Sequence, residues 1–199
     1  LRIGASDTIC RYFLVPYLSR FHKEFPGIHI KVTNNTSIGC VDLLESGLVD
    51  LIFTNYPNSR LGNTGNMTKV RTFQDVFIAN RNYFNLENQK LSFQELLNYP
   101  ILMLDRKSTT SEYLHTLFQQ HQLDLVPEIE LSSNDLLLDL ASIGLGIAFV
   151  PDYCLPKHSS DLFPLTLAED LPSRQLMLVH SEQLPLSPAA KQFLEYFTA

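Results

Sequence analysis

The sequence predicts an α/β fold of two lobes that face a cleft. Short apolar runs with the spacing of strands alternate with longer runs of helical spacing, and polar, hydroxyl-rich loops stand between them. Such strand, loop and helix units build parallel sheets covered by helices, whose ligands bind at the carboxyl ends of the strands. The units fall into two groups, so we assign residues 1–78 and 162–199 to a first lobe and residues 79–161 to a second.

Length and composition are those of a globular chain with ample apolar content for a core. Of 199 residues, 45% are hydrophobic and 18% are charged. No apolar run approaches the roughly 20 residues that cross a bilayer, so we expect no membrane partner. The net charge of −6 argues against nucleic-acid binding by this chain, because that needs a basic face to displace counterions. The chain starts with Leu1 inside a strand pattern and without Met, which indicates a fragment or a processed form.

The opening of the chain predicts a strand, a polar loop and an amphipathic helix. Residues 1–5 alternate, and apolar residues then recur at helical spacing, namely Leu14, Leu18, Phe21 and Phe25. The loop between them, Ser6-Asp7-Thr8, offers helix caps, and the free N–H groups of a helix start can also hold an anion. Pro16 lacks an N–H and crowds the preceding turn, so it predicts a kink or a later helix start near Tyr12.

The same logic repeats along the rest of the first lobe. Residues 28–32 alternate as a strand, and the polar loop 34–37 then opens a helix that Gly47 ends. Residues 49–53 are almost wholly apolar, as in a strand covered on both faces, and Thr54 lies at their end.

The remaining elements follow the same alternation. In chain order they are a β-like segment at 69–80, a helix at 92–98, a strand at 101–104, a helix through 113–118, a strand at 127–131, a helix at 134–143, strands at 147–150, 162–167 and 175–179, and a final helix opened by Ser187-Pro188. Ser92 and Glu95 have the spacing of a capping box, Gly144 suits a helix end, and Pro188 suits a first turn.

Three segments stand out, in this order: residues 3–8 (IGASDT, with Leu14 and Pro16 beyond), residues 43–51 (LLESGLVDL) and residues 141–151 (ASIGLGIAFVP). Together they resemble the effector-binding domain of LysR-type transcriptional regulators. The resemblance covers essentially the whole chain. It implies two Rossmann-like lobes with a central cleft, like type 2 periplasmic binding proteins, a small-molecule effector in the cleft, and a winged helix-turn-helix domain that this chain lacks.

The same resemblance implies a set of ligand-binding residues. They are Ser6, Thr8, Thr36, Ser37, Thr54, Thr109 and Thr110, with Phe149 as an apolar wall. From the residues alone, plain helix capping explains each pair of hydroxyls equally well. Arg11, Arg106 and Lys107 could complement a carboxylate or be solvated loop charges. The resemblance further implies a homodimer with helices of opposite lobes in contact, a higher oligomer in the full-length protein, and DNA binding only through the absent N-terminal domain.

The three cysteines, Cys10, Cys40 and Cys154, are odd in number and widely spaced. This pattern argues against a disulfide framework and favours a reducing cytoplasm. Cys10 and Cys40 each fall near a predicted helix start, where a thiolate is stabilised, so redox sensing is one hypothesis for them. The other is that they are small core residues, as free cysteines usually are.

Catalytic and metal-binding patterns are missing from the sequence. The six histidines lack metal-binding spacing, and neither a nucleophile elbow nor a glycine-lysine phosphate loop occurs. We therefore predict that the chain is not an enzyme and that it uses no cofactor and no metal. Our preferred function is the sensing of a small, anionic metabolite, such as an organic or amino acid, by a regulator. The alternatives are a solute-binding protein of a transporter and a small enzyme on the same fold.

Overall fold

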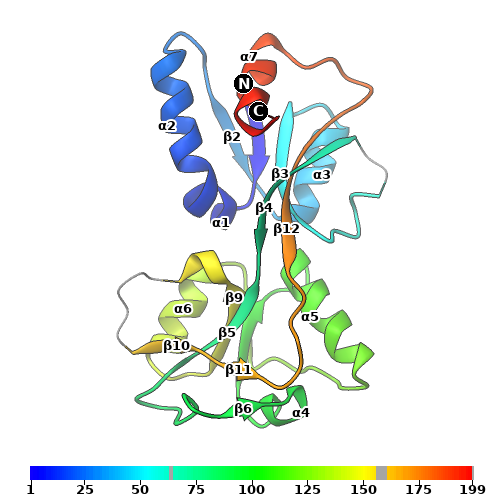
Figure 1. Ribbon diagram of the computed structural model, residues 1–199. Coiled ribbons are helices and arrows are strands. Elements are labelled where there is room, and N and C mark those ends of the chain that lie inside the picture. Colours follow the sequence, from blue (N-terminus) through cyan, green and yellow to red (C-terminus); the bar gives the residue numbers. More distant parts are fainter. Residues whose placement is uncertain (63–64, 156–160, 199) are drawn as a thin grey trace. The chain divides into compact units, whose positions relative to one another are not determined.

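The computed structural model describes residues 1–62, 65–155 and 161–198 and divides into two compact units. Unit 1 comprises Leu1–Thr72 and Gln175–Ala199, and unit 2 comprises Phe73–Arg174, so the chain crosses between them twice (Figure 1). These borders correct the predicted ones. Residues 73–78 and 162–174 belong to unit 2 because β5 (Asp75–Asn80) and β10 (Leu162–Pro164) pair there, Leu162 opposite Asn80. Residues 156–160 of the predicted second lobe lie outside the described residues.

Unit 1 holds a five-stranded sheet in the order β2-β1-β3-β12-β4. Its strands are β1 Arg2–Ala5, β2 Lys31–Asn34, β3 Leu51–Tyr56, β4 Asn66–Phe73 and β12 Arg174–His180. Its helices are α1 Asp7–Ile9, α2 Val15–Glu24, α3 Ser37–Glu45 and α7 Pro188–Thr198. β1 runs parallel to β2 and β3, as predicted, but β12 runs antiparallel to β3. The sheet is therefore mixed, because β12 returns from unit 2 and pairs beside β3 rather than following a helix crossover.

The kink predicted at Pro16 takes the form of a change in helix type. Between α1 and α2, residues Cys10–Leu14 form a π-helical stretch, in which the N–H of Val15 reaches back to the carbonyl of Cys10. Pro16 then falls in the first turn of α2, directly after this stretch, so the missing N–H coincides with the change from π-helical to α-helical structure. The alternative of a start near Tyr12 is wrong, because helical structure begins at Asp7 under a Ser6 cap.

Residues on both faces of β3 form the core of unit 1. Leu51 and Phe53 join α2 and α7 through Phe21 and Phe193, whose rings meet edge to face at 5.2 Å. Ile52 joins the opposite cluster with Val41 and Leu44 of α3 and with Val179 of β12. The near-continuous apolar run at 49–53 thus marks a strand covered on both faces, as predicted.

Unit 2 holds a five-stranded sheet in the order β10-β5-β9-β7-β8 and a small sheet of β11 and β6. Besides β5 and β10, its strands are β6 Lys90–Leu91, β7 Ile101–Leu104, β8 Ile129–Leu131, β9 Ile147–Pro151 and β11 Thr166–Leu167. Its helices are α4 Phe93–Leu96, α5 Thr109–Gln120, α6 Asn134–Ser142 and a single 3₁₀ turn, Asp152–Cys154. β7 runs parallel to β8 and β9, whereas β5 runs antiparallel to β9 and β10.

Two predicted segments are each broken in two. The β-like segment at 69–80 becomes β4 and β5 with a break at Gln74, and the segment at 162–167 becomes β10 and β11 with a break at Leu165. The first break marks the passage of the chain from unit 1 to unit 2. Of the helices in the described ranges, none has the length and apolarity needed to cross a membrane.

Candidate functional site

The carboxyl ends of the parallel strands in unit 1 bring the predicted loops of that unit to one edge. Ala5 lies opposite Asn34 of β2 and Phe53 of β3, so Ser6 and Asn35 leave the sheet beside Thr54. Thr54 itself continues β3 and pairs with Met177 of β12, so the predicted strand end at Phe53 is wrong. Ser6 caps α1 and accepts a hydrogen bond from the N–H of Ile9 at 3.3 Å. Ser6 and Thr8 both keep part of their surface exposed.

The start of α3 at this edge is built on a hydrogen-bonded cluster. Thr36 is the N-cap and accepts from the N–H of Gly39 at 3.0 Å. Buried Thr54 donates to the carbonyl of Ser37 at 3.3 Å and accepts from the side-chain amide of Asn58 at 2.8 Å. Asn58 also donates to the carbonyl of Ser37 at 3.0 Å, while the hydroxyl of Ser37 accepts from the N–H of Asn55 at 3.3 Å.

This cluster unites three of the predicted residues, Thr36, Ser37 and Thr54, and adds one that the sequence did not reveal. Asn58 stands in a loop rich in Asn, Ser and Pro, where nothing marks it from its neighbours. The hydroxyl of Thr54 is already engaged as donor and acceptor. Thr54 and Ser37 therefore stabilise the start of α3 from its buried side. The predicted residues of unit 1 with exposed surface are Ser6, Thr8 and Thr36.

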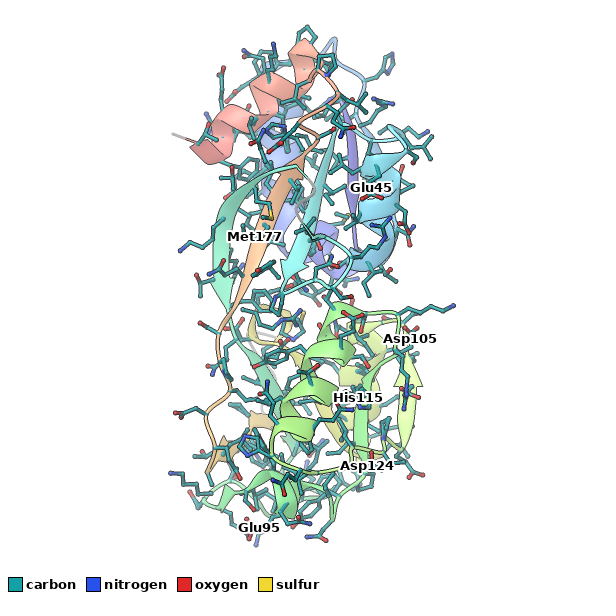
Figure 2. All side chains as sticks on the ribbon, turned by 90° about the vertical axis from the view of Figure 1, so that its right-hand side faces the viewer. Glu45, Glu95, Asp105, His115, Asp124 and Met177 are labelled. Carbon is teal, nitrogen blue, oxygen red and sulfur yellow. The ribbon has the colours of Figure 1, made fainter. Side chains whose placement is uncertain are left out.

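In unit 2 the loop that begins at Asp105 leads into α5 (Figure 2). Ser108 is its N-cap and accepts from the N–H of Ser111 at 3.1 Å. The next three side chains, Thr109, Thr110 and Ser111, are buried. The two predicted residues, Thr109 and Thr110, therefore occupy the first helical turn, as expected. Their side chains, although polar, are buried in unit 2.

Thr110 lies against a buried ion pair that the sequence did not reveal. Its hydroxyl accepts from Nη1 of Arg174 at 3.0 Å, and the same nitrogen donates to Oδ2 of Asp75 at 2.9 Å. Both charged side chains have no exposed surface. The guanidinium carbon lies 5.5 Å from the ring centre of Phe73 and 5.0 Å from that of Tyr113. Two aromatic rings therefore flank the cation.

Burial shifts the pKa values of two side chains in this cluster. It raises the pKa of Asp75, against the opposing attraction of Arg174. It also raises the pKa of Tyr113 to about 12, with a further contribution from the charge of Asp75. Tyr113 is thus a neutral phenol at physiological pH, and its hydroxyl donates to the carbonyl of Pro172 at 2.9 Å.

The remaining predicted site residue, Phe149, is packed in the core of unit 2. It has no exposed surface, and its ring lies 4.6 Å from that of Phe77 on the neighbouring strand. Packing in this core is sufficient to explain an aromatic side chain at position 149. The role of Phe149 as a wall of a ligand site stays a prediction.

Two of the three cationic residues considered with the site, Arg106 and Arg11, have local partners. Nε of Arg106 lies 3.9 Å from a carboxylate oxygen of Glu130, and the guanidinium carbon of Arg11 lies 5.7 Å from the ring centre of Tyr12. The side chain of Arg106 is 76% exposed, which favours the interpretation as a solvated loop charge.

The two cysteines near helix starts have raised pKa values. Burial, aided by Asp7, raises the pKa of Cys10 to about 11, and burial raises that of Cys40 to about 12. Both thiols are therefore protonated at neutral pH, whereas a redox-sensing cysteine reacts as the thiolate. The geometry favours the hypothesis of small core residues.

A shallow pocket of about 200 Å³ runs along β5 and the segment 165–171 of unit 2. Three carboxylates, Asp75, Glu169 and Asp170, line it together with apolar side chains. Within the described parts of the chain, no three His, Cys, Asp or Glu side chains gather closely enough to hold a metal ion.

A family model described as the LysR substrate binding domain matches residues 1–199. The chain belongs to this family. The HTH-type transcriptional activator CmpR of Synechocystis is 28% identical over 201 residues, which cover 98% of this chain and 64% of CmpR. The chain thus spans less than two thirds of the length of this relative.

Solved structures of LysR proteins share the fold. The Synechocystis CcmR regulatory domain in complex with 2-PG matches with a TM-score of 0.87 at 22% identity, over 99% of this chain and 94% of that one. The effector binding domain of QuiR in complex with shikimate matches with a TM-score of 0.82 at 17% identity, over 100% and 96% of the two chains.

These matches confirm the predicted fold class, an α/β fold of two Rossmann-like lobes of the type 2 periplasmic-binding-protein kind. They also confirm the predicted family, which is a regulator-domain family and not an enzyme family. The alternative of a transporter's solute-binding protein has no support from these relatives.

Proposed function

We propose that this chain is the effector-binding domain of a LysR-type transcriptional regulator and that it senses a small anionic metabolite. The family match over residues 1–199 carries the proposal. CmpR is named an HTH-type transcriptional activator, and the chain covers 64% of it. A DNA-binding helix-turn-helix in the part outside the match would give this regulator its contact with DNA, in the cytoplasm.

The chemistry of the helix starts supports an anionic effector. α3 and α5 each follow a strand and begin under a hydroxyl cap, Thr36 and Ser108. The first N–H groups of such helices point outward, and the helix dipole favours negative charge there. The CcmR domain is in complex with 2-PG and the QuiR domain with shikimate, which are small ligands of this kind. We assign contact roles to Ser6, Thr8 and Thr36 in unit 1.

For unit 2 we assign contact roles to Thr109 and Thr110, in the first turn of α5. Ser37 and Thr54 support the α3 start through the hydrogen bonds described above, and Phe149 keeps its proposed role as an apolar wall. Effector binding would act on the DNA-binding part by favouring one conformation over another. The free energy available for this equals the difference in the effector's affinity for the two conformations.

Self-association is the second part of the proposal. Large apolar side chains are exposed on α6 and just beyond it, namely Leu136, Ile143 and Leu145. Contiguous exposed apolar patches mark protein interfaces, and we propose that these three side chains belong to one. We expect this chain to form a homodimer and the full-length protein to form a higher oligomer. Light scattering of the purified chain tests the dimer, and a monomer mass at every concentration would contradict it.

A thermal-shift screen tests the effector proposal. The chain is heated with organic acids, amino acids and phosphorylated acids, including 2-PG, shikimate and benzoate. A ligand that binds only the folded state raises the melting temperature by mass action. We expect at least one anionic compound to stabilise the chain, with the effect reduced in Thr8→Val and Thr109→Val.

Two matched variants control this screen. Thr116 is an exposed threonine on the same helix as Thr109, and Thr198 is an exposed threonine of unit 1. Thr116→Val and Thr198→Val should leave the shift unchanged. Stabilisation by cationic or neutral compounds alone would contradict an anionic effector, and an unchanged response in Thr8→Val and Thr109→Val would contradict the assigned residues.

A further inference from the structure

The guanidinium of Arg174 is only partly used by the protein. Nη1 holds both of its side-chain hydrogen bonds, to Asp75 and to Thr110. Within the described ranges, Nε and Nη2 have no hydrogen-bond partner and no exposed surface. A guanidinium offers five N–H donors, and a bidentate carboxylate or phosphate is the partner that uses two of them at once. Arg174 therefore retains unused capacity for an anion.

The first turn of α5, beside this guanidinium, also presents donors. The hydroxyl of Thr110 accepts from Arg174, so its own hydrogen remains free to donate. The buried hydroxyl of Ser111 has no partner among the residues that the structure describes. The N–H groups of Thr109 and Thr110 belong to the first turn, which lacks carbonyl partners within its own helix. A group rich in acceptors is what this set of donors can bind.

Asp75 is the internal counter-ion of Arg174. It meets the guanidinium through Oδ2 alone, and its other oxygen, Oδ1, is buried without a partner in the described part of the chain. This single-point contact contrasts with the two-point geometry that makes arginine and carboxylate pairs strong. An anionic ligand at α5 would therefore compete with Asp75 for the same cation.

We propose that Arg174 anchors the anionic group of the effector, a carboxylate or a phosphate, at the first turn of α5, and that Asp75 holds the guanidinium in place and weakens this binding by competing for it. The inference rests on the proposed function, because it names the residue that receives the effector's charge. Among the four side chains around the guanidinium, Phe73, Asp75 and Thr110 are buried, whereas Tyr113 keeps exposed surface. The side of the guanidinium that Tyr113 covers is therefore where we propose that the anion approaches.

The competition separates this role from a purely structural one. If the pair only supports the fold, loss of either partner weakens ligand binding. If Arg174 anchors the ligand, removal of the competing charge in Asp75→Asn strengthens binding, while Arg174→Gln weakens it. The double variant Asp75→Asn/Arg174→Gln removes both charges together, so no buried charge is left unpaired to unfold the chain.

The experiment uses the full chain with inorganic phosphate and succinate as probes, at constant ionic strength set with chloride. Isothermal titration calorimetry gives the Kd, and circular dichroism confirms folding. We expect binding about tenfold tighter in Asp75→Asn and at least about tenfold weaker in Arg174→Gln and in the double variant. Arg20→Gln breaks an exposed ion pair with Glu24 in unit 1 and serves as the matched control, with an unchanged Kd.

The outcomes distinguish this inference from the proposed function. If a compound from the screen binds and the folded double variant keeps its affinity, the Arg174 anchor is wrong and the effector-binding function stands. Equal or weaker binding in Asp75→Asn also overturns the competition. If neither the screen nor the two probes stabilise the wild-type chain or Asp75→Asn, the anionic effector and the Arg174 anchor are both wrong.

Discussion

The starts of α3 and α5 look alike in sequence, but the buried side chains behind them differ in charge and in hydrogen bonding. Each follows a strand and begins with a hydroxyl cap that receives a hydrogen bond from the N–H three residues on. Behind α3, the neutral side chains of Thr54 and Asn58 satisfy each other and the carbonyl of Ser37. Behind α5 lies a buried ion pair, and several donors there have no partner among the residues that the structure describes. The same local pattern thus supports a neutral cluster in unit 1, in which the side chains of Thr54 and Asn58 are engaged, and a charged cluster with unpartnered donors in unit 2.

The largest expected effect on stability comes from breaking the charged cluster. Arg174→Ala leaves Asp75 buried without its cation, which should cost about 3–5 kcal/mol of unfolding free energy. Chemical denaturation monitored by circular dichroism measures the loss. Arg20→Gln, at an exposed pair, should cost no more than about 1 kcal/mol. Equal losses in the two variants would contradict the view that the ion pair of unit 2 is a buried structural element.

Breaking the neutral cluster should have a smaller effect. Thr54→Val removes a buried hydroxyl, so the Asn58 amide and the Ser37 carbonyl each lose one hydrogen bond. The expected cost is about 1–3 kcal/mol of unfolding free energy. The same denaturation experiment applies, with Thr72→Val, at an exposed position of unit 1, as its control. A loss as large as that of Arg174→Ala would erase the contrast between the clusters.

The caps themselves should behave alike. Thr36→Ala and Ser108→Ala each remove one side-chain acceptor from a helix start, so each should cost about 1 kcal/mol. Paired melting curves of the two variants measure this. A clear difference between them would mean that the buried cluster behind a helix alters the strength of its cap.

The smallest expected effect is a dependence on pH in unit 2. His115 is half-buried on α5, its Nε2 has no partner within the described ranges, and Figure 2 labels it above Asp124. Burial lowers the pKa of His115 below its ordinary value of 6.5, with a contribution from Arg106, while Glu130 and Asp124 oppose the shift. The unfolded chain therefore binds more protons as the pH falls below 6.5.

Stability is consequently lost as the pH drops from 6.5 toward the lowered pKa of the folded state, and it is unaffected by His115 above that window. Melting temperatures measured across this window should fall less in His115→Gln than in the wild-type chain. Identical profiles for the two chains would show that His115 does not contribute to the pH dependence.

The elements that local signals define were predictable. The capping box of Ser92 and Glu95 opens α4, and Gly47 and Gly144 stand just beyond helix ends with φ of 68° and 81°, which non-glycine residues rarely adopt. The antiparallel β12 was not predictable, because its direction depends on a partner strand distant in sequence. The break at Gln74 was missed for a similar reason, since apolar residues continue on both sides of it.

The residues of the candidate site likewise include some that local signals predict and some that they do not. Hydroxyl caps at Ser6, Thr36 and Ser108 follow from loop position, because capping is a local property. The pair of Asp75 and Arg174 joins residues 99 positions apart, and no spacing rule reaches so far. One local signal was present, since Asp75 interrupts an apolar strand pattern and a charged residue there calls for a buried partner.

The double crossing of the chain has a consequence for biosynthesis. Unit 2 is one continuous segment, whereas unit 1 needs both ends of the chain, because β12 lies between β3 and β4 in its sheet. On the ribosome, all residues of unit 2 are therefore synthesised while β4 still lacks its neighbour β12. The sheet of unit 1 stays incomplete until Gln175–Ala199 has emerged. Until then β3 and β4 lack the strand that separates them in the finished sheet, and unpaired strand edges of this kind can pair with other chains.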